Sequence, residues 1–158
     1  MRYEIELINQ TDYHTRAIRK ILREMMRECG ITKLRCELYY SRQSLVLSNG
    51  LWIGTRSYGV MGWGSINRPH IRIGLPNTFE VWDANGVSCG RERFDPQQSL
   101  GADQRHAFVR EIAATVYHEI GHTLGLRHGD MSREMMHPCR DAPRFHCVDG
   151  ITFTRRAI

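Results

Sequence analysis

The sequence predicts an α+β fold in which one sheet packs against two long helices. The order of the patterns indicates this class, because a strand-like stretch, a helical stretch, a run of strands and a second helical stretch follow one another. The chain has 158 residues, of which 41% are hydrophobic and 25% are charged, values typical of one soluble globular domain. It contains no internal repeat or linker, so a single domain is expected.

The first two predicted elements are a strand and a helix. Residues 1–8 alternate between polar and apolar side chains, which is typical of a strand. A helix is expected to follow, with Thr11 or Asp12 as its N-cap and Cys29 at its end. Gly30 is the predicted C-cap, since glycine tolerates the left-handed backbone that ends helices. Apolar residues at helical spacing form its buried face: Ile18, Ile21, Leu22, Met25 and Met26.

A series of strands is predicted between the two helices. Residues 33–40 and 44–54 are rich in branched and aromatic side chains and are predicted as two strands with a break between them. A glycine-rich stretch covers residues 54–64. Residues 69–76 alternate and are bounded by prolines, which favours a strand near a sheet edge. Residues 77–102 are predicted to be loop-like, with a turn at Asn85-Gly86.

The second helix is predicted over residues 103–124 and has two distinct faces. One is apolar and is expected to be buried: Val109, Ile112, Ala113, Val116 and Ile120. The other is polar, and its members recur at spacings of four, three and four: Glu111, Thr115, His118 and His122. A helix of this kind suits the floor of a cleft.

The motif H-E-x-x-H-x-x-G-x-x-H begins at His118, within this helix. Because positions i and i+4 share one helix face, His118 and His122 can offer nitrogens to one metal ion. Glu119 would point toward the open side of that ion. Gly125 would end the helix so that the chain turns back and His128 becomes the third ligand. Three histidines with a fourth position open to water are typical of catalytic zinc.

The full motif is specific. A polar helix with solvated histidines is the alternative interpretation, but average residue usage produces all five specified letters by chance in roughly one chain of this length in a hundred thousand. We therefore predict a metal site.

From His118 to Pro138 the chain resembles the metzincin clan of zinc endopeptidases, and within it the matrixins. Metzincins follow the third histidine with a tight turn whose methionine lies beneath the metal, and Met136 stands at that place. Pro138 corresponds to the pocket-wall proline of matrixins, whereas astacin-like and serralysin-like members carry a tyrosine ligand there. The histidine and aspartate set that holds a structural zinc in animal matrixins is absent, and no calcium loop is evident.

The resemblance implies a metzincin-like (zincin-like) architecture. Its sheet would be twisted and mixed, with an antiparallel edge strand, and residues 103–124 would be the active-site helix. The catalytic domain, residues 1–158, would divide after Gly125 into an N-terminal subdomain (1–125) and a small C-terminal subdomain (126–158).

The implied substrate is a polypeptide in extended conformation, bound along an exposed strand of the sheet. Residues 70–75 and the stretch from Tyr58 to Trp63 are both candidates for that strand. Three residues are expected to flank the substrate pocket: Pro138, Cys139 and Arg140.

The implied activity is that of a zinc-dependent endopeptidase with one catalytic Zn²⁺ held by His118, His122 and His128. Glu119 would take a proton from the zinc-bound water and pass it to the leaving amine. The alternative is a zinc-binding protein of the same fold that no longer cleaves and acts as a binding module. The presence of Glu119, which is not a metal ligand, favours the enzyme.

Charge and cysteine content indicate few further partners. The net charge of +5 is spread along the chain, so no nucleic-acid partner is expected, and a monomer is favoured. Five cysteines cannot all pair, and free thiols are expected, with a Cys139–Cys147 disulfide as the main alternative. The first residues do not resemble a secretory signal, and no apolar run could span a membrane. A cytoplasmic location, or release by a route other than Sec, is therefore expected.

Overall fold

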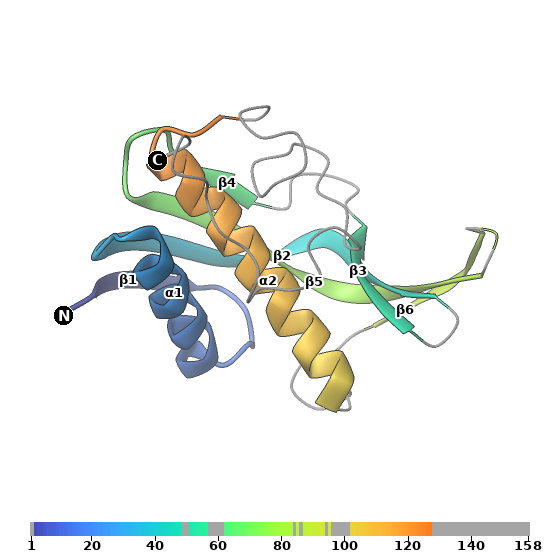
Figure 1. Ribbon diagram of the computed structural model, residues 1–158. Coiled ribbons are helices and arrows are strands. Elements are labelled where there is room, and N and C mark those ends of the chain that lie inside the picture. Colours follow the sequence, from blue (N-terminus) through green and yellow to red (C-terminus); the bar gives the residue numbers. More distant parts are fainter. Residues whose placement is uncertain are drawn as a thin grey trace.

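The computed structural model describes residues 2–48, 51–56, 62–83, 85, 87–93, 95 and 102–127. These residues form two helices and six strands, which confirms the predicted α+β class (Figure 1). In chain order the elements are β1 (Glu4–Asn9), α1 (Thr15–Cys29), β2 (Lys33–Ser48), β3 (Leu51–Arg56), β4 (Gly62–Gly64), β5 (His70–Trp82), β6 (Ser88–Arg93) and α2 (Ala102–Thr123).

The six strands form one mixed sheet whose main order is β1-β2-β5-β4. β1, β2 and β5 are parallel, and β4 is antiparallel to β5. β3 and β6 pair antiparallel with the far ends of β2 and β5, respectively. The predicted mixed sheet with an antiparallel strand beside the parallel ones is therefore confirmed.

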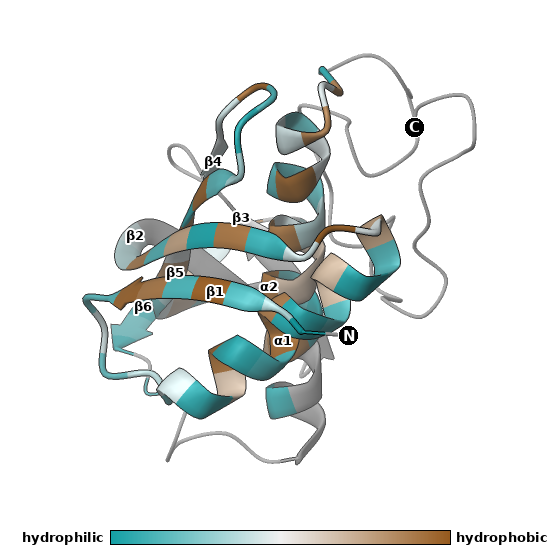
Figure 2. Ribbon diagram, turned by 90° about the vertical axis from the view of Figure 1, so that its left-hand side faces the viewer, coloured by the Kyte–Doolittle hydropathy of each residue, from teal (hydrophilic) through white to brown (hydrophobic). Residues whose placement is uncertain are grey.

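The hydrophobic core lies between the sheet and the two helices. Alternate residues of β2 and β5 turn to this side, as the two-residue period of a strand requires. Figure 2 shows hydrophobic positions recurring along α2 where it lies beside the strands. The core residues with the least exposed surface are Ile18, Leu22, Met26, Leu34, Cys36, Leu38, Ile71, Ile73, Leu75, Phe108, Ile112, Val116 and Ile120. In the described part of the chain, no helix has the length and apolar character needed to cross a membrane.

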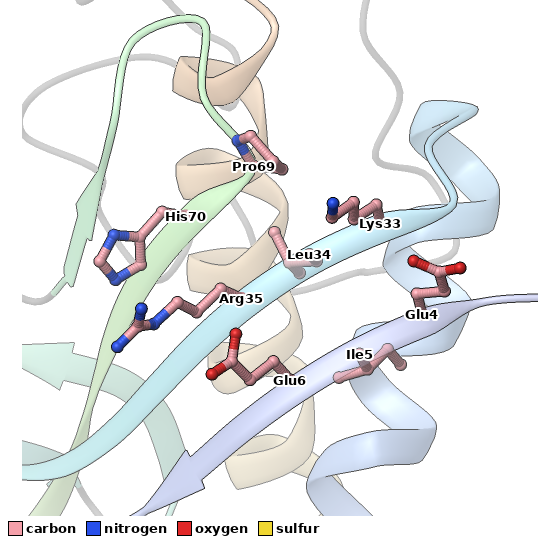
Figure 3. A pocket seen from close by; sticks show the side chains of 8 residues that line it. All are labelled: Glu4, Ile5, Glu6, Lys33, Leu34, Arg35, Pro69 and His70. Atoms are coloured by element: carbon pink, nitrogen blue, oxygen red, sulfur yellow. The ribbon is translucent and has the colours of Figure 1, made fainter.

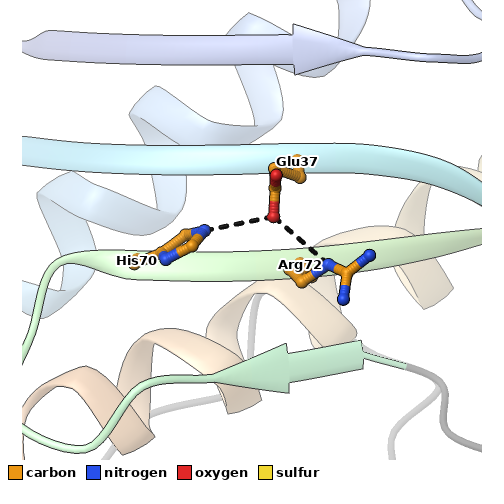
Figure 4. A network of polar contacts seen from close by, with 3 residues as sticks. All are labelled: Glu37, His70 and Arg72. Atoms are coloured by element: carbon orange, nitrogen blue, oxygen red, sulfur yellow. Dashed lines mark hydrogen bonds and ion pairs between the residues drawn. The ribbon is translucent and has the colours of Figure 1, made fainter.

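The opposite face of the sheet is polar. The Oε2 atom of Glu37 lies 3.2 Å from both His70 Nε2 and Arg72 Nε (Figure 4). A hollow of about 540 Å³ lies over the beginnings of β1, β2 and β5 (Figure 3). Its lining combines acidic and basic residues and includes none of the predicted catalytic, metal-binding or pocket residues. The lining residues are Glu4, Ile5, Glu6, Lys33, Leu34, Arg35, Pro69 and His70.

Helix α1 begins later than predicted, because both expected cap residues bond elsewhere. Asn9 Oδ1 accepts hydrogen bonds from the backbone N–H and the hydroxyl of Thr11, at 2.9 and 2.7 Å. The Tyr40 hydroxyl accepts a hydrogen bond from the backbone N–H of Asp12 at 3.0 Å and donates one to Asp12 Oδ2 at 3.2 Å. A turn therefore follows β1, and the helix starts at Thr15 without a side-chain cap. The expected N-cap at Thr11 or Asp12 is wrong.

The end of α1 is as predicted. Gly30 has the left-handed conformation, with φ +70° and ψ +28°. Its N–H donates to the Arg27 carbonyl at 3.2 Å, and the N–H of Ile31 donates to the Met26 carbonyl at 3.0 Å. These two bonds form a Schellman motif.

Two strand predictions were wrong: the break after residue 40 and the edge position of residues 69–76. β2 continues to Ser48, and the predicted break is a shift of register between Ser41 and Ser44. β5 is not at the sheet edge, because it pairs with β2 on one side and β4 on the other. Pro76 is tolerated within this interior strand since it pairs with Ser41, where the β2–β5 ladder becomes irregular.

The predicted loop over residues 77–102 is wrong for its first part, which forms a β-hairpin. β5 runs on to Trp82 and pairs with β6. Asp83 Oδ1 accepts hydrogen bonds from the N–H groups of Asn85 and Val87, both at 2.9 Å. Of the predicted Asn85-Gly86 turn, the structure describes Asn85, which lies in a turn between the two strands.

Helix α2 matches its predicted span to within one residue at each end, but one residue of its buried face was misassigned. Val109 is 37% exposed, whereas its neighbour Phe108 is 1% exposed. Phe108 and Ile112, four residues apart, belong to the deeply buried stripe of the helix. Val109 lies beside that stripe.

The cysteines of the described chain should differ sharply in reactivity. Cys29, Cys36 and Cys89 are free thiols, as predicted, and the proposed Cys139–Cys147 pair lies outside the described residues. Burial, with a smaller contribution from a neighbouring glutamate, raises the pKa of Cys29 and of Cys36 to about 12. Cys89 is exposed on β6.

We expect iodoacetamide at pH 8 to modify Cys89 in the native protein, and Cys29 and Cys36 only after unfolding, because a buried neutral thiol is a poor nucleophile. Peptide mapping by mass spectrometry would measure this. Native modification of Cys36 at the rate of Cys89 would contradict the described core.

Candidate metal centre

The last two turns of α2 carry the candidate site. His118 and His122 are one turn apart, and their ring centroids are 5.0 Å from each other with the rings almost perpendicular. One potential ligand atom from each of His118, Glu119 and His122 lies within 4.8 Å of the others. The helix spacing therefore brings together three of the predicted site residues, and such a cluster can hold a metal ion.

The cluster lies where α2 packs against the sheet. The helix contacts β3, β4 and β5 as well as α1. His118 is 8% exposed and Glu119 is 5% exposed, so a carboxyl group and an imidazole are largely removed from water. Burying such groups is costly unless they are paired or bind an ion. Their burial therefore favours an ion-binding site over a solvated helix face.

A hydrogen bond determines which nitrogen of His122 faces the cluster. Nδ1 of His122 lies 2.7 Å from the carbonyl oxygen of Leu126. Because a carbonyl only accepts, Nδ1 carries the hydrogen and donates it. The lone pair then belongs to Nε2, which is the arrangement that a metal-binding imidazole requires.

Gly125 ends the helix and thereby places the Leu126 carbonyl. Its φ is +92°, a conformation that favours glycine. The N–H of Gly125 donates to the His122 carbonyl at 2.9 Å, and the N–H of Leu126 donates to the Gly121 carbonyl at 3.0 Å. This is the same Schellman motif that ends α1. The predicted stop at Gly125 is confirmed.

The connection between β4 and β5 lies against this helix end. The N–H of Asn67 also donates to the His122 carbonyl, at 3.3 Å, and Asn67 itself adopts a positive φ of 60°. A Cβ atom on Gly125 would lie 2.9 Å from Asn67 Oδ1, so the Asn67 side chain would have to shift. The His122 carbonyl therefore accepts hydrogen bonds both from the end of its own helix and from the β4–β5 connection.

One of the two candidate strands, residues 70–75, has neighbours on both sides in the described part of the sheet. Along residues 70–75, β5 is paired with β2, and at Ile71–Ile73 it is paired with β4 too, so it has no free edge there. β4 lies beyond β5 and contacts α2. Within the described chain, β4 pairs with β5 alone, which leaves its other side as the antiparallel edge next to the site.

Two glycines of β4 belong to the site but were missed at the sequence level. A Cβ atom on Gly62 would lie 3.0 Å from Glu119 Oε1, and one on Gly64 would lie 3.1 Å from Glu119 Oε2. The available signal was their spacing of two within the glycine-rich stretch, which in a strand places both on one face.

The remaining predicted site residues lie outside the described part of the chain. They are the third ligand, the Met-turn methionine and the pocket residues: His128, Met136, Pro138, Cys139 and Arg140. Their roles, and the division into subdomains, stay predictions.

Comparison with known proteins supports the same interpretation. Residues 77–147 match the family model described as Matrixin. This part of the chain is matrixin-like. It includes α2 with His118, Glu119 and His122, and it spans a little under half of the 158 residues. A comparison with curated protein sequences found no match.

The matrixin match confirms the resemblance predicted from the motif and supports a metallopeptidase kind of protein. The mixed sheet and the two helices agree with a matrixin-like fold.

The two helix ends allow a matched test of Gly125. We expect Gly125→Ala to lower the free energy of unfolding by about 1–2 kcal/mol, because a left-handed backbone disfavours a side chain. It should also weaken zinc binding, since the Leu126 carbonyl orients His122. Urea denaturation and zinc titration would measure the two effects.

Gly30→Ala is the control, because Gly30 ends α1 in the same motif and its Cβ position is open. It should lose stability and keep the zinc affinity. Equal zinc affinities in the two variants would contradict the orienting role of this helix end.

Proposed function

We propose that the protein is a zinc-dependent endopeptidase. His118, His122 and His128 would hold the metal, and Glu119 would act as the general base. The main support is the meeting of two imidazoles and a buried carboxylate at the end of α2, within the matrixin-like segment. A merely structural zinc site would not need Glu119 beside the ligands.

The described residues fit a zinc ion. His118 and His122 are nitrogen donors one turn apart, and the bond from His122 Nδ1 to Leu126 leaves Nε2 available. Neutral imidazole is a good ligand for zinc, and a hydrogen bond from the other ring nitrogen is the usual way to orient it. When bound, zinc supplies Lewis acidity that lowers the pKa of water and stabilises a developing oxyanion.

Glu119 supplies the proton transfers in this proposal. Its carboxylate would accept a proton from the attacking water as the oxygen of that water bonds to the peptide carbonyl carbon. The same group would then deliver the proton to the amide nitrogen as the carbon–nitrogen bond breaks. Because Glu119 follows the first ligand directly and is buried, its position is set by the helix and the strand beside it.

The proposed substrate is a polypeptide in extended conformation, paired with the free side of β4. Backbone groups of Gly62–Gly64 would then bond to substrate backbone, a mode of binding that aligns a peptide without reading its side chains. Preference would come from the pocket predicted at Pro138, Cys139 and Arg140, where Arg140 favours acidic or polar side chains.

The proposal is tested by cleavage-site profiling. The zinc-loaded protein is incubated with a peptide library, and new termini are identified by mass spectrometry. We expect internal cleavages with a shared sequence preference, which a chelator abolishes and added zinc restores. A protein that binds zinc tightly and produces no new termini would instead support the alternative of an inactive binding module.

Substitution of Glu119 should separate chemistry from metal binding. We expect Glu119→Ala to keep the fold and the zinc while lowering kcat by about 10²–10⁴-fold, the range expected for loss of a general base. The isosteric Glu119→Gln should behave alike, because it also lacks a basic oxygen. Peptide hydrolysis assays beside metal analysis measure this, and an undiminished kcat in either variant removes the base assignment.

Substitution of His122 should instead remove the metal. We expect His122→Ala to lose zinc on dialysis, since two nitrogen ligands bind far more weakly than three. His70→Ala is the control, because His70 lies on the opposite face of the sheet, bonded to Glu37. Metal analysis after dialysis should show full zinc for the control. Equal zinc content in the two variants would exclude His122 as a ligand.

A further inference from the structure

Strand β4 passes α2 with two glycines facing the helix and a tryptophan facing away. Trp63 is 43% exposed, and its ring packs edge-on against His70 at 5.1 Å, on the polar face of the sheet. Since side chains alternate along a strand, Gly62 and Gly64 present their bare backbone to the other face. Glu119 is the residue they meet there.

The two glycines meet different atoms of Glu119. A Cβ atom on Gly62 would lie 3.0 Å from both Cγ and Oε1 of the Glu119 side chain, and 2.9 Å from the Arg72 carbonyl oxygen of the next strand. A Cβ atom on Gly64 would first collide with the backbone carbonyl oxygen of Glu119. It would also lie 2.9 Å from His122 Cβ and 3.1 Å from Glu119 Oε2. Gly64 therefore limits how closely the backbones approach, whereas Gly62 contacts the carboxylate-bearing side chain.

We infer that Gly62 is a positioning residue for Glu119, and that Gly64 allows the close approach of strand and helix on which this contact depends. The inference rests on the proposed function. A general base has to be held within about 0.5 Å of its working position. With glycine at position 62, the Glu119 side chain lies directly against the backbone of β4, the strand proposed to pair with substrate. The same strand, β4, would then position both the general base and the substrate backbone.

The alternative is that Gly62 merely permits packing. Gly74 of β5 provides a glycine of that kind within the same sheet. A Cβ atom there would collide with the side chain of Ser41 and lie 3.3 Å from Tyr39, and no atom of the candidate site is among its neighbours. Gly74→Ala is therefore a steric control with the tighter closest contact of the two, and it displaces Ser41 and Tyr39 instead of Glu119.

The kinetic test compares these two variants with the unaltered protein, using a peptide found by profiling. We expect Gly62→Ala to lower kcat at least about tenfold while KM changes less than about threefold, because the side chain that it displaces is that of the base. Its zinc content should remain at one per chain. Gly74→Ala should lower the melting temperature and leave kcat unchanged. A Gly62→Ala protein that holds zinc and has the original kcat would overturn the inference.

A second measurement does not depend on activity. In a double-mutant cycle on metal-free protein, Glu119→Ala removes the Cγ-linked carboxylate that a side chain at position 62 would meet. The loss of stability caused by Gly62→Ala should then be smaller in the Glu119→Ala background. The loss caused by Gly64→Ala should change less between the two backgrounds, because its tightest collision is with the backbone oxygen of residue 119, which is still present.

Equal losses for Gly62→Ala in the two backgrounds, or failure to fold in both, would count against the inference, since the collision would then be with Arg72. Failure of the unaltered protein to cleave any peptide would remove the proposed function, and this cycle would still decide whether Gly62 contacts the Glu119 side chain.

Discussion

The contact between α2 and the sheet is the constraint on which the rest of the structure depends. The helix buries a hydrophobic stripe that includes Phe108, Ile112 and Ile120. On an adjoining face it also buries His118 and Glu119, which are less than 10% exposed. Only a strand without side chains on that face can lie so close to Glu119. β4 provides this with Gly62 and Gly64, so the hydrophobic core and the candidate site are parts of one packing arrangement.

The end of the helix is controlled as closely as its side. Gly125 stops α2 in a Schellman motif, and the next residue supplies the carbonyl that holds the His122 ring. The β4–β5 connection bonds to the same turn through Asn67. His122 is thus bonded by Asn67, which precedes it in the chain, and by Leu126, which follows it. Hydrogen bonds of this kind, from residues that are not ligands, usually orient a metal ligand.

Much of this arrangement was predictable from local patterns. Helical periodicity placed α2 to within one residue at each end and identified Gly30 and Gly125 as helix ends, because cap conformations depend on few neighbours. Several of the predictions that were wrong depended on distant partners. Asp12 was a candidate cap for α1 but bonds to Tyr40, and β5 was expected at an edge but lies between β2 and β4.

The sequence by itself determined the spacing of His118, Glu119 and His122 on one helix turn, since 3.6 residues per turn leaves no freedom once the helix forms. It also determined the chemistry available there and the likeness to matrixins. Only the tertiary structure decided that β4 is the outer strand and that Gly62 lies against Glu119. The approach of β4 to α2 joins residues more than fifty positions apart, and no local pattern encodes such a contact.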